Sequence, residues 1–296
     1  MALLINTNIM AQNAARNLAG AYTALSKSVR KLSSGLRVGT AADDAAGLAV
    51  SELMRANVAV FNQGVRNAND AISLVQTADG ALAVIDEKLI RMKELAEQAA
   101  TGTYTSAQRL VIDSEYQAMA SEITRIANAT DFNGVYLLNG NLSSSTQSGS
   151  GLQATGKLLV HFGSGKDTKE DYYYVRVDKA TADAFGVGNA STKDAGYAIS
   201  TQAAAQDSLD AVDKAIVSKD RIRADLGAVQ SRLEGTVTSL EMQAENLESA
   251  RARITDVDVS TEMTEFVRQQ ILAQAATAML AQANVMPRLA LQLLGV

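Results

Sequence analysis

The segment 71–95, AISLVQTADGALAVIDEKLIRMKEL, decides the fold class. Its small and apolar residues recur at alternating steps of three and four, the spacing of a helix that packs along another helix. These positions are Ala71, Leu74, Ala78, Ala81, Ile85, Met92 and Leu95. No Pro occurs in 43–100, so we expect one helix of roughly 55 residues and about 80 Å. Such a helix is too long for a compact globule and needs a partner along its seam.

Local signals mark the ends of this helix and the start of the next. Asp43 and Asp44 suit a helix N-terminus, and Thr101-Gly102-Thr103 ends the helical pattern. Apolar residues then resume steps of four and three, which predicts a shorter returning helix. These residues are Ile112, Tyr116, Met119, Ile123 and Ile126.

The first 42 residues carry five basic side chains and no acid. Their apolar residues also step by four and three, so they predict a second seam, which Ser33-Ser34-Gly35 ends. The seam residues are Leu18, Tyr22, Leu25, Val29 and Leu32. A transit peptide is also acid-poor and amphipathic. The length of the seam and its counterpart at the other end of the chain favour a structural helix.

Helical spacing returns near residue 200 and continues to the C-terminus. One seam is formed by Leu226, Leu233, Val237, Leu240, Ala244, Leu247 and Ile254, and a final amphipathic segment carries Met263, Val267, Ile271, Ala275 and Ala278. We expect Pro287 to interrupt this last helix. The acids Asp256, Asp258, Glu262 and Glu265 complement the basic first segment, so the two chain ends are predicted to pair.

The centre of the chain has a different character. Asn133-Gly134 and Asn139-Gly140 are turn signals, and two β-like runs, 157–162 and 172–177, predict a hairpin. The expected fold is therefore mainly α. Its N- and C-terminal halves form a long antiparallel coiled-coil bundle, with a small central β-hairpin region.

Composition excludes chemistry that needs Cys or a cluster of His residues. The chain has no Cys and a single His, His161, and its net charge of −5 argues against nucleic acid as a partner. No apolar stretch is long enough to span a membrane, and the start lacks a secretory signal pattern. The segment 151–157 has phosphate-loop spacing but is followed by Leu158, and a calcium-like start at Asp256 lacks the required Gly and Glu. We predict no enzyme, no cofactor and no metal.

Several runs at both chain ends resemble bacterial flagellins. They are INTN at 5–8, KLSSGLR at 31–37, AADDAAGLA at 41–49, RMKELAEQA at 91–99, DFNG at 131–134 and RITDVD at 253–258, with IL at 271–272 and LL at 293–294. The resemblance covers about 1–140 and 200–296, and the centre does not match in detail. Only about 60 residues separate the two halves, so a short form with little or no outer domain is expected.

The resemblance implies a structural subunit that polymerises into the helical bacterial flagellar filament used for motility. Residues 1–40 and 255–296 would form the innermost core helices, which fold on assembly around a central channel. Residues 41–140 and 200–254 would form the helical bundle domain, and 141–199 a short β-rich variable insert. The core seam would comprise Leu18, Tyr22, Leu25, Val29 and Leu32 with Met263, Val267 and Ile271.

The same resemblance implies partners and a location. The subunit would be extracellular, exported through the flagellar secretion apparatus without a cleaved signal peptide. An export chaperone would bind the C-terminal helix, and hook-associated and cap proteins would contact the filament. A host Toll-like receptor would read Arg91, Leu95, Gln98 and Glu115. Two alternatives are a hook–filament junction protein and a coiled-coil adaptor or chaperone that forms no polymer.

Overall fold

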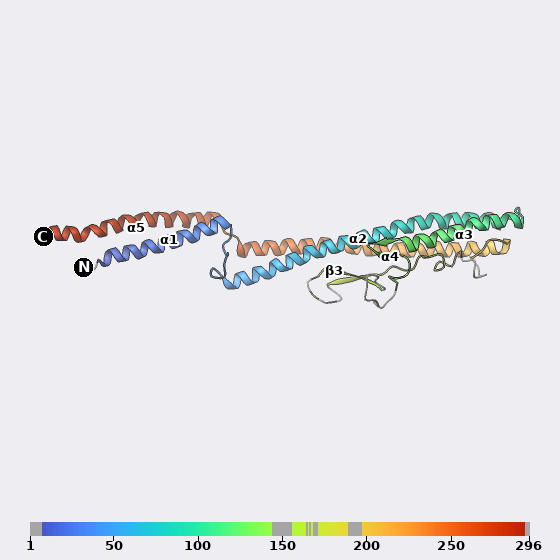
Figure 1. Cartoon of the computed structure of the whole chain (residues 1–296), viewed down its shortest axis with the longest axis horizontal. Coiled ribbons are helices and arrows are strands. Elements are labelled where there is room, and N and C mark those ends of the chain that lie inside the picture. Colours follow the sequence, from blue (N-terminus) through green and yellow to red (C-terminus); the bar gives the residue numbers. More distant parts are fainter. Residues whose placement is uncertain are drawn as a thin grey trace. The chain divides into compact units, whose positions relative to one another are not determined.

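The computed structural model describes residues 8–143, 156–163, 165, 167, 171–188 and 197–293, the last seven of them by their backbone alone. Its helices are α1 (Ile9–Ser34), α2 (Ala45–Ala100), α3 (Ser106–Ala129), α4 (Gln202–Thr255) and α5 (Val259–Leu293). Its strands are β1 (Asp131–Phe132), β2 (Val135–Tyr136), β3 (Leu158–His161) and β4 (Tyr172–Val175). The predicted mainly helical class is confirmed (Figure 1).

Two compact units make up the chain. One lies within residues 1–58 and 245–296, and the other spans 59–244. In the first unit α1 and α5 pack side by side, as the sequence predicted for the two chain ends (Figure 1). In the second unit, parts of α2 and α4 pack with α3 around a continuous hydrophobic core. The calcium-like segment at Asp256, which the sequence already argued against as a calcium loop, forms the short link between α4 and α5.

The seam of α2 forms the middle of this core. Six of its seven predicted residues are buried, and Ala81 is half-buried. The opposing helices contribute Tyr116 and Ile123 from α3 and Leu226 and Leu233 from α4. Burial also raises the pKa of the Tyr116 hydroxyl, so it stays neutral.

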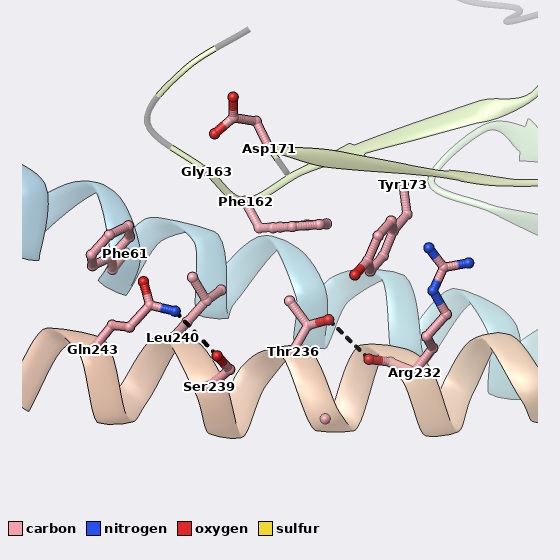
Figure 2. A pocket seen from close by; sticks show the side chains of 11 residues that line it. Phe61, Phe162, Gly163, Asp171, Tyr173, Arg232, Thr236, Ser239, Leu240 and Gln243 are labelled. Atoms are coloured by element: carbon pink, nitrogen blue, oxygen red, sulfur yellow. Dashed lines mark hydrogen bonds between the residues drawn. The ribbon is translucent and has the colours of Figure 1, made fainter. Parts of the chain in front are cut away.

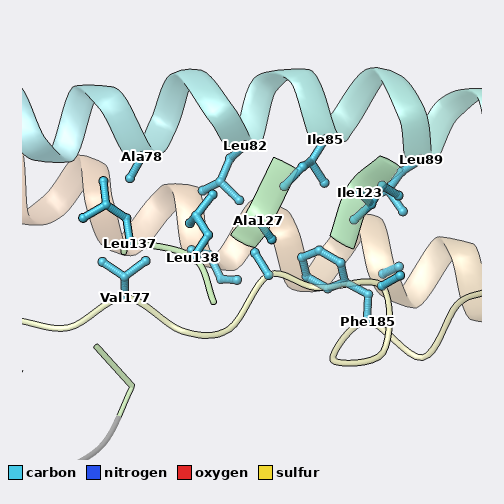
Figure 3. Packing of buried hydrophobic residues seen from close by; sticks show 14 of the residues in the cluster. Ala78, Leu82, Ile85, Leu89, Ile123, Ala127, Leu137, Leu138, Val177 and Phe185 are labelled. Carbon is cyan, nitrogen blue, oxygen red and sulfur yellow. The ribbon is translucent and has the colours of Figure 1, made fainter. Parts of the chain in front are cut away.

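Segments without regular structure close the bundle (Figure 3). Leu137 and Leu138 follow the β1–β2 hairpin and lie against Ala78 and Leu82 of α2, and Val177 and Phe185 extend the same apolar layer. All of these side chains are buried. The part of 141–199 that the structure describes is therefore integral to the core of the second unit.

Helix ends follow the local signals in the sequence. The first helix ends at Ser34, and Gly35 adopts a left-handed φ of 74° while its N–H donates to Lys31 O. The second helix begins after Asp44, whose carboxylate accepts the N–H of Gly47 at 2.9 Å. At the far end of α2, buried Arg109 donates to the carbonyl of Ala99 at 2.8 Å. These contacts satisfy backbone groups that the helices leave open.

Two small hairpins complete the fold. β1 and β2 pair around Asn133 and Gly134, which both have positive φ, 52° and 82°. β3 and β4 pair antiparallel, with Leu158 opposite Val175 and His161 opposite Tyr172. The hairpin predicted for 157–162 and 172–177 is confirmed, with shorter strands.

Ion pairs at heptad spacing join α2 to α4 within the second unit. Asp79 binds the guanidinium of Arg223 at 2.6 Å, and Asp86 binds the ammonium group of buried Lys219 at 2.6 Å. One heptad further, Lys93 binds an acid of α4, Asp213. In the first two pairs the acid lies on α2, whereas in the third pair the base lies on α2. A register shifted by one heptad would therefore place like charges next to each other.

The expectation that Pro287 interrupts the last helix is wrong. The backbone of α5 remains helical from Val259 to Leu293 and passes through Pro287. A Pro lacks the N–H that would bond the carbonyl four residues earlier, which belongs to Ala283. That carbonyl instead accepts the side-chain amide of Asn8 at 2.8 Å. The lost bond within the helix is replaced by a bond from α1.

We predict opposite effects for alanine at two glycines of α2. A Cβ at Gly64 would lie 2.3 Å from the carbonyl oxygen of Phe162, whereas a Cβ at Gly80 would meet nothing within 4 Å. Gly64→Ala should push the hairpin away and lower the free energy of unfolding by about 1–3 kcal/mol. Gly80→Ala should raise it by up to about 1 kcal/mol, since Ala favours helix. Urea unfolding of both variants checks this, and equal effects would contradict the close packing at Gly64.

Candidate assembly surface

A cavity of 720 Å³ lies between the β3–β4 hairpin and the helices α2 and α4 (Figure 2). The Arg232 guanidinium lies 3.8 Å from the centre of the Tyr173 ring, and Phe162 packs edge-on against the same ring. The carboxylate of Asp171 accepts hydrogen bonds from the backbone N–H groups of Gly165 and Asp167. The lining holds no His, no Cys and no second acid. This set of residues offers no nucleophile with a base beside it.

No candidate metal site occurs in the part of the chain that the structure describes. This part contains no group of three His, Cys, Asp or Glu side chains that could hold a metal ion. Asp43 and Asp44, which were predicted to mark a helix start, lie directly before α2. The ammonium group of Lys27 and the hydroxyl of Thr40 lower the pKa of Asp43 to about 2. Residues 151–155 of the segment with phosphate-loop spacing lie outside the described residues.

The contact between α1 and α5 is built from small residues. On α1 the buried positions are Ala14, Ala21 and Ser28, each seven residues from the next. On α5 they are Ala273, Ala276 and Ala283. Small side chains let the two helix backbones approach closely. On α1 the sequence signal for this face is the heptad spacing of its small residues. These residues lie beside the predicted seam of larger apolar residues.

Larger apolar residues of the predicted seam lie beside this alanine contact. Tyr22 and Val29 are exposed, and Leu18, Leu25 and Leu32 are half-buried. On α5 the three predicted residues Met263, Val267 and Ile271 are all exposed, Ile271 to 59%. Further exposed apolar residues of the two helices are Ile9, Met10, Leu272, Met279, Val285 and Met286. The apolar faces of α1 and α5 are therefore only partly covered within one chain.

Charge complementarity between the chain ends rests on one acid. Glu262 accepts the hydroxyl of Ser28 at 2.6 Å and lies 3.3 Å from the ammonium nitrogen of Lys31. The other acids are used locally: Glu265 pairs with Arg268, and Asp258 accepts N–H groups at the start of α5. Glu262 thus provides the polar contact at the base of the α1–α5 pair.

Backbone hydrogen bonds join the segment after α1 to the end of α4. Arg37 N donates to Thr255 O at 2.6 Å, and Val257 N donates to Gly35 O at 3.0 Å. The guanidinium of Arg37 adds a bond to the carbonyl of Ile254 at 2.6 Å. This junction sets the point from which α1 and α5 run together.

The four residues predicted as a receptor site do not share one exposed face. Arg91 donates to Glu115 at 2.8 Å, a bond that raises its pKa, and Gln98 donates to the hydroxyl of Tyr104 at 3.0 Å. Leu95 is only 1% exposed and belongs to the core of the second unit. Leu95 was also predicted in the seam of α2, and its burial confirms that prediction and removes it from the exposed surface that a receptor could contact.

The helices are long and paired, and the apolar faces of α1 and α5 are only partly covered within one chain. These features are typical of self-associating helical structural proteins. None of the helices in the described part of the chain is apolar over a length sufficient to cross a membrane. Two comparisons identify the family within this class. The chain matches the bacterial flagellin N-terminal helical region over residues 5–143 and the bacterial flagellin C-terminal helical region over residues 209–294.

Relatives match along nearly the whole chain. Identity is 40% over 292 residues to a flagellin of Halalkalibacterium halodurans, covering 99% of this chain and 100% of that protein. Identity is 42% over 307 residues to a flagellin of Bacillus subtilis, covering 98% of this chain and 99% of that protein. The chain therefore belongs to the bacterial flagellin family, the structural subunits of the flagellar filament.

A solved structure shares the fold at low identity. It is a chain from Vibrio parahaemolyticus that was assigned provisionally as a flagellar hook-associated protein. The two are 15% identical with a TM-score of 0.55, over 72% of this chain and 100% of that one. This likeness concerns the fold alone.

Proposed function

We propose that this chain polymerises into the flagellar filament through the apolar faces of α1 and α5. Family membership and the exposure of Tyr22, Val29, Met263, Val267 and Ile271 support this. Full burial of one such side chain is worth about 1.5–3 kcal/mol, so a shared interface with several of them holds subunits firmly. A head-to-tail interface that does not close produces a helical polymer.

The proposal assigns a role to each part of the chain. Residues 1–40 and 255–296 are the innermost helices around a central channel, and they gain most of their burial on assembly. Residues 41–140 and 200–254 are the bundle, and 141–199 form the short β-rich variable insert. The alanine contact supports this division, since it holds α1 on α5 while leaving their larger side chains for neighbouring subunits.

Export through the flagellar secretion apparatus to the cell exterior is part of the same proposal. A chain that passes through a narrow channel must travel unfolded and refold at the far end. The absence of Cys removes disulfide formation from refolding. The contacts within the two hairpins and between α2 and α3 are local in sequence, which favours fast folding of these parts.

Charged substitutions on α1 test the proposed surface. Val29→Asp and Leu25→Asp should abolish filaments, because burying an unpaired carboxylate costs several kcal/mol or more. Val29 is exposed in the single chain, so the monomer of that variant should unfold at an unchanged urea concentration. Ser26→Asp adds the same charge beside the seam at an exposed position and is the matched control. Electron microscopy of concentrated monomer gives the readout.

Two results would contradict the proposed surface. Normal filaments from both seam variants would show that these residues face no packed interface. A parent chain that never polymerises alone would favour the hook–filament junction protein or a non-polymerising adaptor. Limited proteolysis adds a separate check, since the segments 1–40 and 255–296 should be cut faster in monomer than in filament.

We propose further that an export chaperone covers α5 before secretion, and that hook-associated and cap proteins contact the filament ends. The exposed Met263, Val267 and Ile271 support the first point, since such a face is an aggregation hazard in a monomer. A chain lacking 256–296 should lose chaperone binding, and a chain lacking 1–40 should keep it.

Recognition by a host Toll-like receptor is proposed for the exposed side of the bundle. Arg91, Gln98 and Glu115 support it, because all three are exposed and Arg91 is held in place by Glu94 and Glu115. Arg91→Ala monomer should signal more weakly than the parent. Arg125→Ala removes an exposed Arg of α3 with its own carboxylate partner, Glu122, and should signal normally. Equal signalling by both variants would place the receptor site elsewhere.

A further inference from the structure

The alanine contact between α1 and α5 cannot by itself fix how the helices align. Ala14 and Ala21 lie seven residues apart on α1, and Ala276 and Ala283 lie seven apart on α5. A slip of one heptad moves Ala21 into the position that Ala14 leaves, so the seam looks much the same afterwards. Alanine also lacks the bulk that lets a side chain insert into one particular hole.

Two polar contacts bracket this seam. At one end Glu262 binds Ser28 and Lys31, and at the other the Asn8 side chain donates to the carbonyl of Ala283 at 2.8 Å. Asn8 lies 20 residues before Ser28, and Ala283 lies 21 residues after Glu262. At 1.5 Å per residue both distances are about 30 Å. Only one alignment of the helices satisfies both contacts.

The carbonyl of Ala283 is free for this contact because of the sequence of α5 itself. In an uninterrupted helix the N–H of residue 287 would donate to it, and Pro287 has none. Ala283 is also buried on the face toward α1. A carbonyl without a partner there would carry the cost of lost hydration. Asn8 supplies the missing donor.

The carboxamide of Asn8 can accept one hydrogen bond and donate another at the same time. Its oxygen accepts the N–H of Ala11 at 3.0 Å and caps the start of α1, while its amide nitrogen donates to Ala283. The cap fixes the orientation of the carboxamide, so the amide N–H₂ group has a defined direction. An Asp would keep the cap and lose the donor.

We propose that Asn8 and Pro287 together determine the register of the terminal helix pair. Pro287 leaves one carbonyl in the interior of α5 without a donor from its own helix, and Asn8 donates to that carbonyl. The device presents the apolar faces of α1 and α5 to other subunits in one alignment, and this last consequence rests on the proposed polymerisation. The register itself is a property of the single chain.

Cysteine cross-linking measures the register directly, because the parent chain has no Cys. Ala14→Cys is combined in turn with a Cys at 269, 276 or 283. Because Ser28 contacts Glu262 and Asn8 contacts Ala283, residue 14 faces residue 276, and the positions 269 and 283 sample a slip of one heptad in either direction. Ala14 and Ala276 are both buried between the two polar contacts. Under mild oxidation of monomer, the pair 14 and 276 should dominate in the parent. Equal cross-linking at all three positions would show that no single register exists and would overturn the proposal.

Substitution of Asn8 then separates register from helix capping. Asn8→Asp should lower the ratio of the 276 cross-link to the slipped ones about fivefold, the effect of one hydrogen bond. Asn13→Asp makes the same chemical change on the same helix at an exposed site and should leave the ratio unchanged. Equal ratios for the two variants would refute a role of Asn8.

The part played by Pro287 is tested by coupling the two residues. Pro287→Ala restores an N–H that can bond the carbonyl of Ala283, so Asn8→Asp should have little further effect in that background. An unchanged fivefold effect there would show that the freed carbonyl is not the target. Filament formation is scored separately by electron microscopy. Its absence in the parent would overturn the proposed polymerisation, and the cross-link ratios would still decide the register proposal.

Discussion

An apolar stripe on a very long helix must be covered by another part of the chain, and this constraint organises the whole molecule. α2 runs for 56 residues and buries nearly all of its predicted seam in the second unit only because α3, α4 and the segments around Leu137 and Phe185 cover it. The partner α4 comes from the other half of the sequence. The two halves therefore fold by pairing with each other, and the chain ends are brought together as a consequence.

Two solutions to helix alignment coexist in one chain. The second unit uses large side chains and the ion pairs of Asp79, Asp86 and Lys93, whose charge order penalises a slip. The terminal pair packs through alanine, and its polar contacts among the described residues lie near its two ends. Small residues bring backbones close but bury little area, so the larger apolar residues stay outside the contact. The bundle is therefore stable within one chain, while the terminal helices keep apolar residues available for contacts with other subunits.

Local and periodic features could be read from the sequence, and tertiary ones could not. Gly35, Asp44 and the Asn133-Gly134 turn act within a few residues, so their effects were predicted correctly, as was the length of α2. Pro287 was misread because its compensation comes from Asn8, 279 residues away in sequence. Leu95 received two incompatible roles: the heptad seam of α2 placed it correctly in the core, whereas the flagellin resemblance placed it with Arg91 in a receptor site. The core role of Phe185 had no periodic signal at all.

The junction at Arg37 and Thr255 closes a loop of more than 200 residues with a few backbone hydrogen bonds. The conformational entropy lost in closing a loop rises only with the logarithm of its length, so even a doubling costs about 0.6 kcal/mol more. The size of the central region is thus nearly decoupled from the stability of the ends. A foreign peptide or a whole domain inserted between β3 and β4 would add little to that closing cost, which makes this hairpin a natural place to display cargo on a polymer.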